Sequence, residues 1–106
     1  MRNLTPSALQ EYLETADPAP LLLDVREPWE YQRVHLSDSQ LVPMRQIPAA
    51  SQSMESDEEI VVICHHGVRS RQVAMFLESR GFRRVINLQG GIDAWARDLD
   101  PSMPTY

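Results

Sequence analysis

Three short apolar segments, separated by stretches with helical spacing, constrain the fold of this chain more than any other feature. Residues 21–25 are apolar except for Asp24, residues 60–63 are wholly apolar, and a third run lies within residues 84–88. Continuous apolar runs of this length are typical of strands buried on both faces. Strands that alternate with helices predict an α/β fold with a central parallel β-sheet, helices on both faces and right-handed crossovers.

Local signals place the helices around these strands. We expect helices to begin at Pro6 behind a Thr5 cap, at Pro28, after Gly67, and at the Gly90–Gly91 turn. A left-handed Gly81 should end the third helix, with the next residue folding back towards Leu77. Residues 39–43 suggest another short strand, and residues 44–54 a short helix or turn. The inward-facing side chains are expected to be Leu9, Tyr12, Leu13, Val73, Phe76, Leu77, Ile92, Trp95 and Ala96.

The length of 106 residues predicts one domain, with a core over about residues 5–98 and a tail over residues 99–106 that wraps the surface or frays. No apolar run approaches the roughly 20 residues that cross a bilayer, and no secretion signal is visible, so we expect no membrane partner. The formal charge of −5 argues against a nucleic-acid partner, although several arginines gather within residues 69–84.

The chain has a single cysteine, Cys64, which excludes an internal disulfide and a cysteine-based zinc finger. A lone thiol without a secretion signal fits the reducing cytoplasm. Cys64 directly follows the apolar run 60–63, and ligand crevices of open α/β sheets lie beyond the carboxyl ends of the strands. A reactive residue is expected at this position.

The segment from Cys64 to Arg71 has the composition of an anion-binding loop. A thiolate at the start of a helix is stabilised by the helix dipole and by free amides, and Gly67 allows the backbone to curl around it. Arg69 and Arg71 add fixed positive charge at the mouth, and the two histidines between Cys64 and Gly67 add partial charge. The loop is therefore suited to a sulfur anion or a small oxyanion.

Two simpler interpretations compete with this one. A lone cysteine is often only a small buried hydrophobic residue. His65 and His66 are more simply loop or surface residues than metal ligands, because consecutive side chains diverge and no other histidine lies nearby in sequence. We therefore predict no metal site.

Four blocks of the sequence resemble the single-domain rhodanese-like family, of the thiosulfate sulfurtransferase type. The blocks are LLDVREPWEY over residues 22–31 with His35 and Leu36 after it, VVICHHGVRS over residues 61–70, Gly81-Phe82 with Val85, and LQGGIDAW over residues 88–95. They follow the family order and span most of the chain. The resemblance implies a single rhodanese-like α/β domain.

The resemblance also implies a mechanism. Cys64 takes a sulfane sulfur from thiosulfate or another donor as a persulfide, and a thiophilic acceptor removes it. The active-site loop would be His65, His66, Gly67, Val68, Arg69 and Ser70, whose amides hold the terminal sulfur while Arg69 positions a small anionic donor. A thiol acceptor and a persulfide-bearing protein are the partners it suggests, and no cofactor is required. The Cys-x4-Arg spacing is one residue shorter than that of related phosphatases of the same fold, which favours sulfur over phosphate.

Asp24 and Arg26 lie at the end of the first apolar run. A buried Asp must be paired or hydrogen-bonded, so a structural pair that supports the active-site loop is favoured over general acid–base work. The sequence departs from the family pattern after His35, where two glycines and a proline are absent. The turn must therefore use Asp38 or Ser39, which tolerate left-handed geometry less well than glycine.

Three functions remain in competition. The first is a persulfide-forming enzyme. The second is a non-catalytic binding or regulatory module, against which the retained Cys64, Gly67 and Arg69 argue. The third is a sulfur carrier for a protein partner. The sequence does not separate the first from the third.

Overall fold

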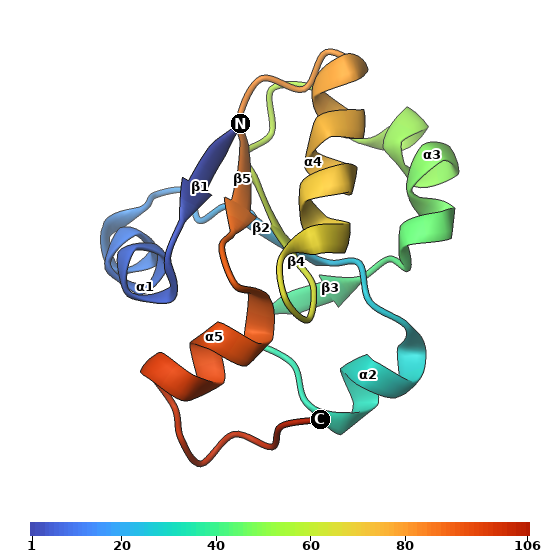
Figure 1. Cartoon of the computed structure of the whole chain (residues 1–106). Coiled ribbons are helices and arrows are strands. Elements are labelled where there is room, and N and C mark those ends of the chain that lie inside the picture. Colours follow the sequence, from blue (N-terminus) through green and yellow to red (C-terminus); the bar gives the residue numbers. More distant parts are fainter.

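A computed structural model of residues 1–106 confirms the predicted α/β class. Five parallel strands form one sheet in the order β1-β5-β4-β2-β3 (Figure 1). The strands are β1 (Arg2–Leu4), β2 (Leu21–Asp24), β3 (Ser39–Leu41), β4 (Ile60–Ile63) and β5 (Val85–Leu88). Strand β4 is therefore the middle strand of the sheet.

Helices cover both faces of this sheet. They are α1 (Pro6–Thr15), α2 (Pro28–Arg33), α3 (Ile47–Ala50), α4 (Val68–Ser79) and α5 (Gly91–Asp98), and single 3₁₀ turns, Met44–Gln46 and Ser51–Ser53, flank α3. Side chains of α3 and α4 pack in one buried cluster, and side chains of α1 and α5 pack in the cluster on the opposite face. None of the helices combines the length and the apolar character needed to span a membrane.

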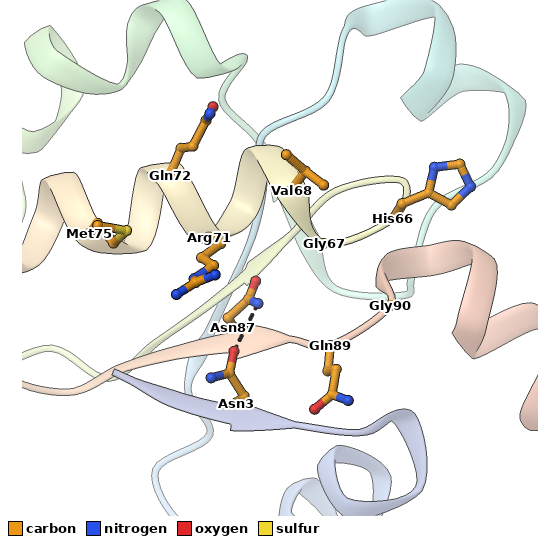
Figure 2. Close-up of a pocket in the computed structure, with 10 residues that line it drawn as sticks. All are labelled: Asn3, His66, Gly67, Val68, Arg71, Gln72, Met75, Asn87, Gln89 and Gly90. Carbon is orange, nitrogen blue, oxygen red and sulfur yellow. Dashed lines mark hydrogen bonds between the residues drawn. The ribbon is translucent and has the colours of Figure 1, made fainter.

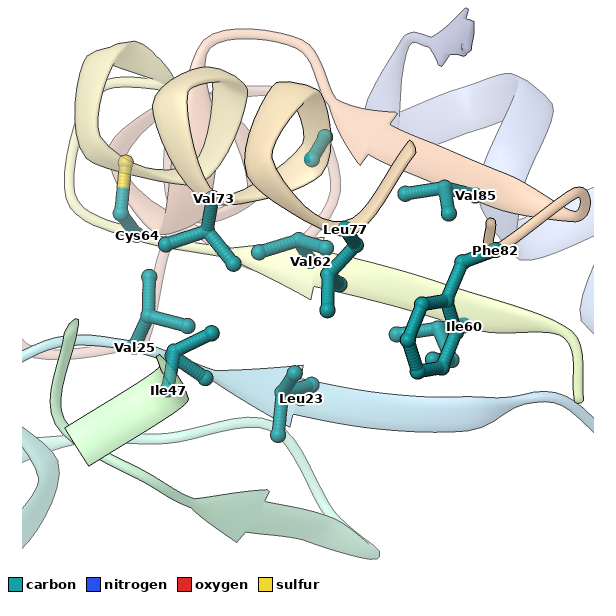
Figure 3. Close-up of a cluster of buried hydrophobic side chains, with 11 residues drawn as sticks. Leu23, Val25, Ile47, Ile60, Val62, Cys64, Val73, Leu77, Phe82 and Val85 are labelled. Atoms are coloured by element: carbon teal, nitrogen blue, oxygen red, sulfur yellow. The ribbon is translucent and has the colours of Figure 1, made fainter. Parts of the chain in front are cut away.

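The alternation of side chains along β4 decides which face Cys64 occupies. Ile60 and Val62 belong to the cluster beneath α3 and α4, whereas Val61 and Ile63 belong to the other one. Cys64 follows β4 and continues the alternation, because successive side chains of an extended strand point to opposite faces. Its sulfur therefore lies beneath the first turn of α4 (Figure 3).

The ends of the helices follow the expected local chemistry. The Thr5 hydroxyl accepts a hydrogen bond from the Ala8 amide at 3.2 Å, and Pro6 occupies the first turn. Gly81 has a φ of 91°, and the Phe82 amide folds back to donate to the carbonyl of Leu77 at 3.1 Å. These caps confirm the start of α1 and the end of α4.

Strand β1 is an element that the sequence did not predict. Arg2, Asn3 and Leu4 pair in register with Ile86, Asn87 and Leu88 of β5, at the edge of the sheet. A three-residue segment with two polar members carries no periodic signal. The sheet therefore extends beyond the 5–98 core that the sequence suggested.

The turn before β3 uses Asp38, one of the two residues that were expected to replace the missing glycine. Asp38 has a φ of 65° and is the only residue other than glycine with a positive φ. Ser39 closes the turn, since its amide and its hydroxyl both donate to the carbonyl of Leu36, at 3.3 and 2.6 Å. A left-handed Asp therefore stands where the family pattern has glycine.

Candidate active site

Cys64 lies at the carboxyl end of the middle strand and just before the longest helix. Its side chain is buried and belongs to the same hydrophobic cluster as Val25, Ile47 and Val73 (Figure 3). The Gly67 amide donates to Cys64 Sγ at 3.0 Å. A left-handed Gly67, with a φ of 98°, begins α4 and turns the backbone over the sulfur.

The amides of the loop are largely free of protein partners. Apart from the Gly67 N–H, the backbone N–H groups of His65, His66, Val68, Arg69 and Ser70 donate to no protein atom. The first amides of a helix lack intrahelical acceptors and carry partial positive charge. A terminal sulfur anion or a small oxyanion is the kind of group that such amides stabilise.

The N-terminus of α5 fixes the orientation of this loop. The Ile92 amide donates to the Cys64 carbonyl at 2.8 Å, and the Asp93 amide donates to the His65 carbonyl at 3.1 Å. A trans peptide is planar, so its N–H points opposite to its C=O. Because α5 holds both carbonyls on its side, the amides of His65 and His66 are directed away from α5.

The approach of α5 depends on a glycine. Gly91 has a φ of 64°, and a Cβ at this position would lie 2.3 Å from the carbonyl oxygen of His65 and 2.5 Å from that of Cys64. No side chain fits at such distances. The Gly90–Gly91 pair, which the sequence suggested only as a turn, therefore lets α5 dock against the active-site loop.

Arg69 is not a free cation at the mouth of the site. Its guanidinium makes two hydrogen bonds to Glu30, from Nη1 to Oε1 at 2.7 Å and from Nη2 to Oε2 at 2.8 Å. The Glu30 side chain is only 4% exposed. Hydrogen bonding from Arg69, together with the Glu27 amide and the Tyr106 hydroxyl, lowers the pKa of Glu30 to about 2 despite its burial. Both partners are charged at neutral pH.

Asp24 and Arg26 form a buried ion pair. Arg26 Nη2 lies 2.7 Å from Asp24 Oδ2, and both side chains have no exposed surface. Arg26 also donates to the Val34 carbonyl at 2.7 Å, at the end of α2. Neither side chain bonds to residues 64–70. Their link to the active-site loop runs through α2, which carries Glu30, so their role as loop support stays a prediction.

The tail lies against the site. The Tyr106 hydroxyl accepts from Arg26 Nη1 at 2.8 Å and donates to Glu30 Oε2 at 2.7 Å, and its ring stacks on His65 at 3.9 Å. Burial is the main cause that raises the pKa of Tyr106 to about 12, so its hydroxyl stays protonated. Of the two outcomes expected for the tail, wrapping is the one observed.

The side chains of His65 and His66 were expected to diverge, but they lie close together. Their ring centroids lie 3.9 Å apart, and the ligand atoms of His65, His66 and Asp93 fall within 4.8 Å of one another. The tight backbone turn before Gly67 brings the rings together. Burial, and secondly the neighbouring His66, lower the pKa of His65 and favour its neutral form. His66 is exposed, and the absence of a metal here stays a prediction.

Ser70 is buried and connects the sulfur to the sheet. The Cys64 thiol donates to Ser70 Oγ at 3.3 Å, and the Ser70 hydroxyl donates to Asn87 Oδ1 at 2.5 Å. Asn87 Nδ2 then donates to Asn3 Oδ1 at 3.0 Å. The side chains of Asn87 and Asn3 are directly opposite on β5 and β1 (Figure 2).

Arg71 is separated from Arg69. It lines a polar cavity of about 640 Å³ between α4 and the β1–β5 edge, together with Asn3, Gln72 and Gln89 (Figure 2). It forms no ion pair, whereas Arg69 faces α2. The structure therefore brings one of the two loop arginines to Glu30 and directs the other to this cavity.

The fold and the site together define a parallel α/β domain that holds one buried thiol, beneath a loop of largely unpaired amides, at the end of its middle strand. Comparison with known proteins narrows this class. Residues 5–98 match the model of the family described as "Rhodanese-like domain". The chain belongs to the rhodanese-like family.

Individual relatives agree with this assignment. The chain is 38% identical over 91 residues to a protein of Allochromatium vinosum named "Sulfurtransferase", covering 86% of this chain and 83% of that protein. It is 40% identical over 89 residues to the chloroplastic rhodanese-like/PpiC domain-containing protein 12 of Arabidopsis thaliana, covering 80% of this chain. The matched region spans only 30% of the length of that plant protein.

Solved structures show the same fold. The crystal structure of a rhodanese-like domain protein from Staphylococcus aureus superposes with a TM-score of 0.83 at 29% identity. The superposition covers 100% of this chain and 99% of that one. The predicted rhodanese-like α/β fold is therefore confirmed over the whole sheet and its helices.

Sequence reasoning found the loop but missed the residues around it. In the sequence Glu30 stood out only as part of the block over residues 22–31, and its partner Arg69 lies 39 residues further along the chain. Asn87 carried a usable signal, since a polar residue inside the run Val85–Leu88 needs a partner when it is buried. Tyr106 gave no signal, because its contacts depend on the path of the tail.

Proposed function

We propose that this protein transfers sulfane sulfur by way of a persulfide on Cys64. The Cys64 thiolate attacks the outer sulfur of thiosulfate, a new S–S bond forms, and the S–S bond to the sulfonate breaks with its electron pair, releasing sulfite. A second thiolate or cyanide then attacks the terminal sulfur and restores the Cys64 thiolate. Charge and electrons balance in both steps without a cofactor.

One observation carries this proposal: the buried Cys64 sulfur lies beneath a loop whose amides lack protein acceptors. The Gly67 amide already contacts Sγ at 3.0 Å. The loop therefore offers hydrogen-bond donors to an anion that extends from the sulfur, and donors arranged before the reaction stabilise developing charge without reorganisation. A cysteine that served packing alone would not require free amides around it.

Arg69 contributes to donor binding in this proposal, although Glu30 shares its charge. Its side chain is 34% exposed, so Glu30 does not remove it from the surface. Glu30 holds the guanidinium of Arg69 in one orientation, which fixes the position of the positive charge. The net field at the mouth is weaker than two free arginines would give.

The same chemistry serves an enzyme with small substrates or a carrier that receives sulfur from a protein. A reducing compartment such as the cytoplasm would keep Cys64 available for either role. The site itself favours small anions, since its donors are backbone amides that surround one sulfur atom. We therefore place the enzyme first and the carrier second.

Steady-state transfer separates these functions. Purified protein is supplied with thiosulfate and cyanide, and thiocyanate formation is measured; a second series replaces thiosulfate with a persulfidated protein and cyanide with glutathione. The enzyme proposal predicts saturable turnover with thiosulfate. Turnover with the protein donor alone would support the carrier, and no sulfur uptake from either donor would leave a binding module.

A further inference from the structure

The polar chain that begins at the Cys64 thiol has a direction. The thiol donates to Ser70, Ser70 donates to Asn87, and Asn87 donates to Asn3, so every hydrogen points from the sulfur towards the edge of the sheet. The first three residues are buried, and Asn3 is exposed on β1 beside the cavity that contains Arg71 (Figure 2).

This direction suits only a protonated sulfur. Once Cys64 has given its proton to solvent, or carries a terminal sulfur anion, the sulfur accepts hydrogen bonds and no longer donates them. The Ser70 hydroxyl would then have to turn towards the sulfur. If it turned alone, the buried Oδ1 of Asn87 would lose its donor, which is unfavourable.

The two asparagines remove this obstacle. A half-turn of an amide side chain exchanges Oδ1 and Nδ2 with almost no change of shape. If both amides turn, Asn3 Nδ2 donates to Asn87 Oδ1, Asn87 Nδ2 donates to Ser70 Oγ, and the Ser70 hydroxyl donates to sulfur. The row of hydrogen bonds then runs in the opposite direction, and every buried polar group keeps a partner. Water satisfies the exposed end of Asn3.

We propose that Asn87 and Asn3 are positioning residues that allow Ser70 to change from accepting the thiol hydrogen to donating to a sulfur anion. This inference rests on the proposed function, because it is the reacting sulfur that passes between the two states. The reversal requires a side chain with both a donor and an acceptor at each asparagine. A carboxylate, which only accepts hydrogen bonds, would hold this row of hydrogen bonds in the direction that suits the protonated thiol.

Asn3→Asp tests this proposal at an exposed position. Gln89→Glu is the matched control, because Gln89 lines the same cavity and its side chain takes no part in the chain. The rate of Cys64 alkylation by iodoacetamide at neutral pH reports the anionic sulfur, and intact mass reports sulfur uptake from thiosulfate. We expect Asn3→Asp to slow both by about tenfold and Gln89→Glu to change them by less than about twofold.

The same pair of variants in a Ser70→Ala background completes the test. Alanine disconnects the sulfur from the asparagines, so Asn3→Asp should cause no further slowing there, as a double-mutant cycle reports. Equal slowing by both carboxylates, or slowing by Asn3→Asp that persists with Ala at position 70, would overturn the proposal in favour of a simple charge effect. Unchanged rates in Asn3→Asp would also overturn it.

Alkylation keeps this test separate from the proposed function. If thiosulfate loads none of the proteins, the sulfur-transfer proposal loses its donor, yet the alkylation rates still decide the role of the asparagines. Thermal unfolding of each variant shows whether the fold is intact. Because Asn3 is exposed on an edge strand, we expect the melting temperature of Asn3→Asp to be close to that of the wild type.

Discussion

Arg69 and Glu30 are 39 positions apart in the sequence and face each other through two parallel hydrogen bonds of 2.7 and 2.8 Å. The pair joins the active-site loop to α2, with Glu30 buried and Arg69 about one-third exposed. Paired hydrogen bonds of this kind fix orientation as well as charge. Arg69 therefore has two roles: it holds the loop against α2, and it is a candidate for binding the sulfur donor.

This double role changes what Arg69→Ala should do. The substitution leaves a buried carboxylate with only the Glu27 amide and the Tyr106 hydroxyl as donors. We expect a loss of about 1–3 kcal/mol in the free energy of unfolding, measured by urea denaturation. We also expect a raised KM for thiosulfate.

The double variant Arg69→Ala with Glu30→Gln separates the two roles. A neutral amide is less costly to bury unpaired than a carboxylate, so most of the lost stability should return. The KM for thiosulfate should remain high, because the positive charge is still absent. If KM recovers together with stability, Arg69 acts on the fold alone.

Stability should depend on acid through Glu30. Its pKa is about 2 in the folded protein, against an ordinary value of 4.5, so its contribution is complete above about pH 4.5 and is lost as the pH falls through about 2. We expect the free energy of unfolding to decline more steeply over this window in the wild type than in Glu30→Gln. Glu11→Gln, which removes an exposed carboxyl without an ion pair, should keep the slope of the wild type.

Gly91→Ala should damage the site through the backbone. The new Cβ would collide with the carbonyls of Cys64 and His65, which α5 holds in place. We expect loss of sulfur uptake, measured by intact mass, and a lowered melting temperature.

Gly81→Ala is the control for this substitution. Gly81 has a φ of 91° but nothing lies within 4 Å of its missing Cβ. It should show only the roughly 1–2 kcal/mol cost of a left-handed alanine and should still take up sulfur. Equal sulfur uptake in the two variants would mean that the docking of α5 does not shape the loop.

The fold was accessible from the sequence where burial leaves a pattern. The runs that became β2, β4 and β5 are apolar because both faces of the sheet are covered, and Gly81 marked a helix end that needs a positive φ. Strand β1 escaped prediction, since an edge strand of three residues has neither the length nor the periodicity of the others.

The site was accessible only in part, for a different physical reason. Cys64 and its loop are contiguous, so strand end, glycine and helix start could be read together. The partners of Arg69 and Ser70 come from distant segments of the chain. The sequence around Glu30, Asn87 or Tyr106 does not predict which side chain each of them contacts. The sequence indicated two arginines at one mouth, whereas the structure directs them to opposite sides of α4.

The proposed sulfur transfer depends on a persulfide at Cys64, and intact mass spectrometry detects that persulfide without an assay of turnover. Wild type and Cys64→Ser are incubated with thiosulfate and desalted, and their intact masses are measured. Both are then treated with cyanide, and the masses are measured again. We expect the wild type to gain one sulfur atom and lose it to cyanide, while Cys64→Ser gains none and melts within a few degrees of the wild type. A sulfur gain that persists in Cys64→Ser, or a folded wild type that gains none from thiosulfate or from a persulfidated protein, would rule out a persulfide on Cys64.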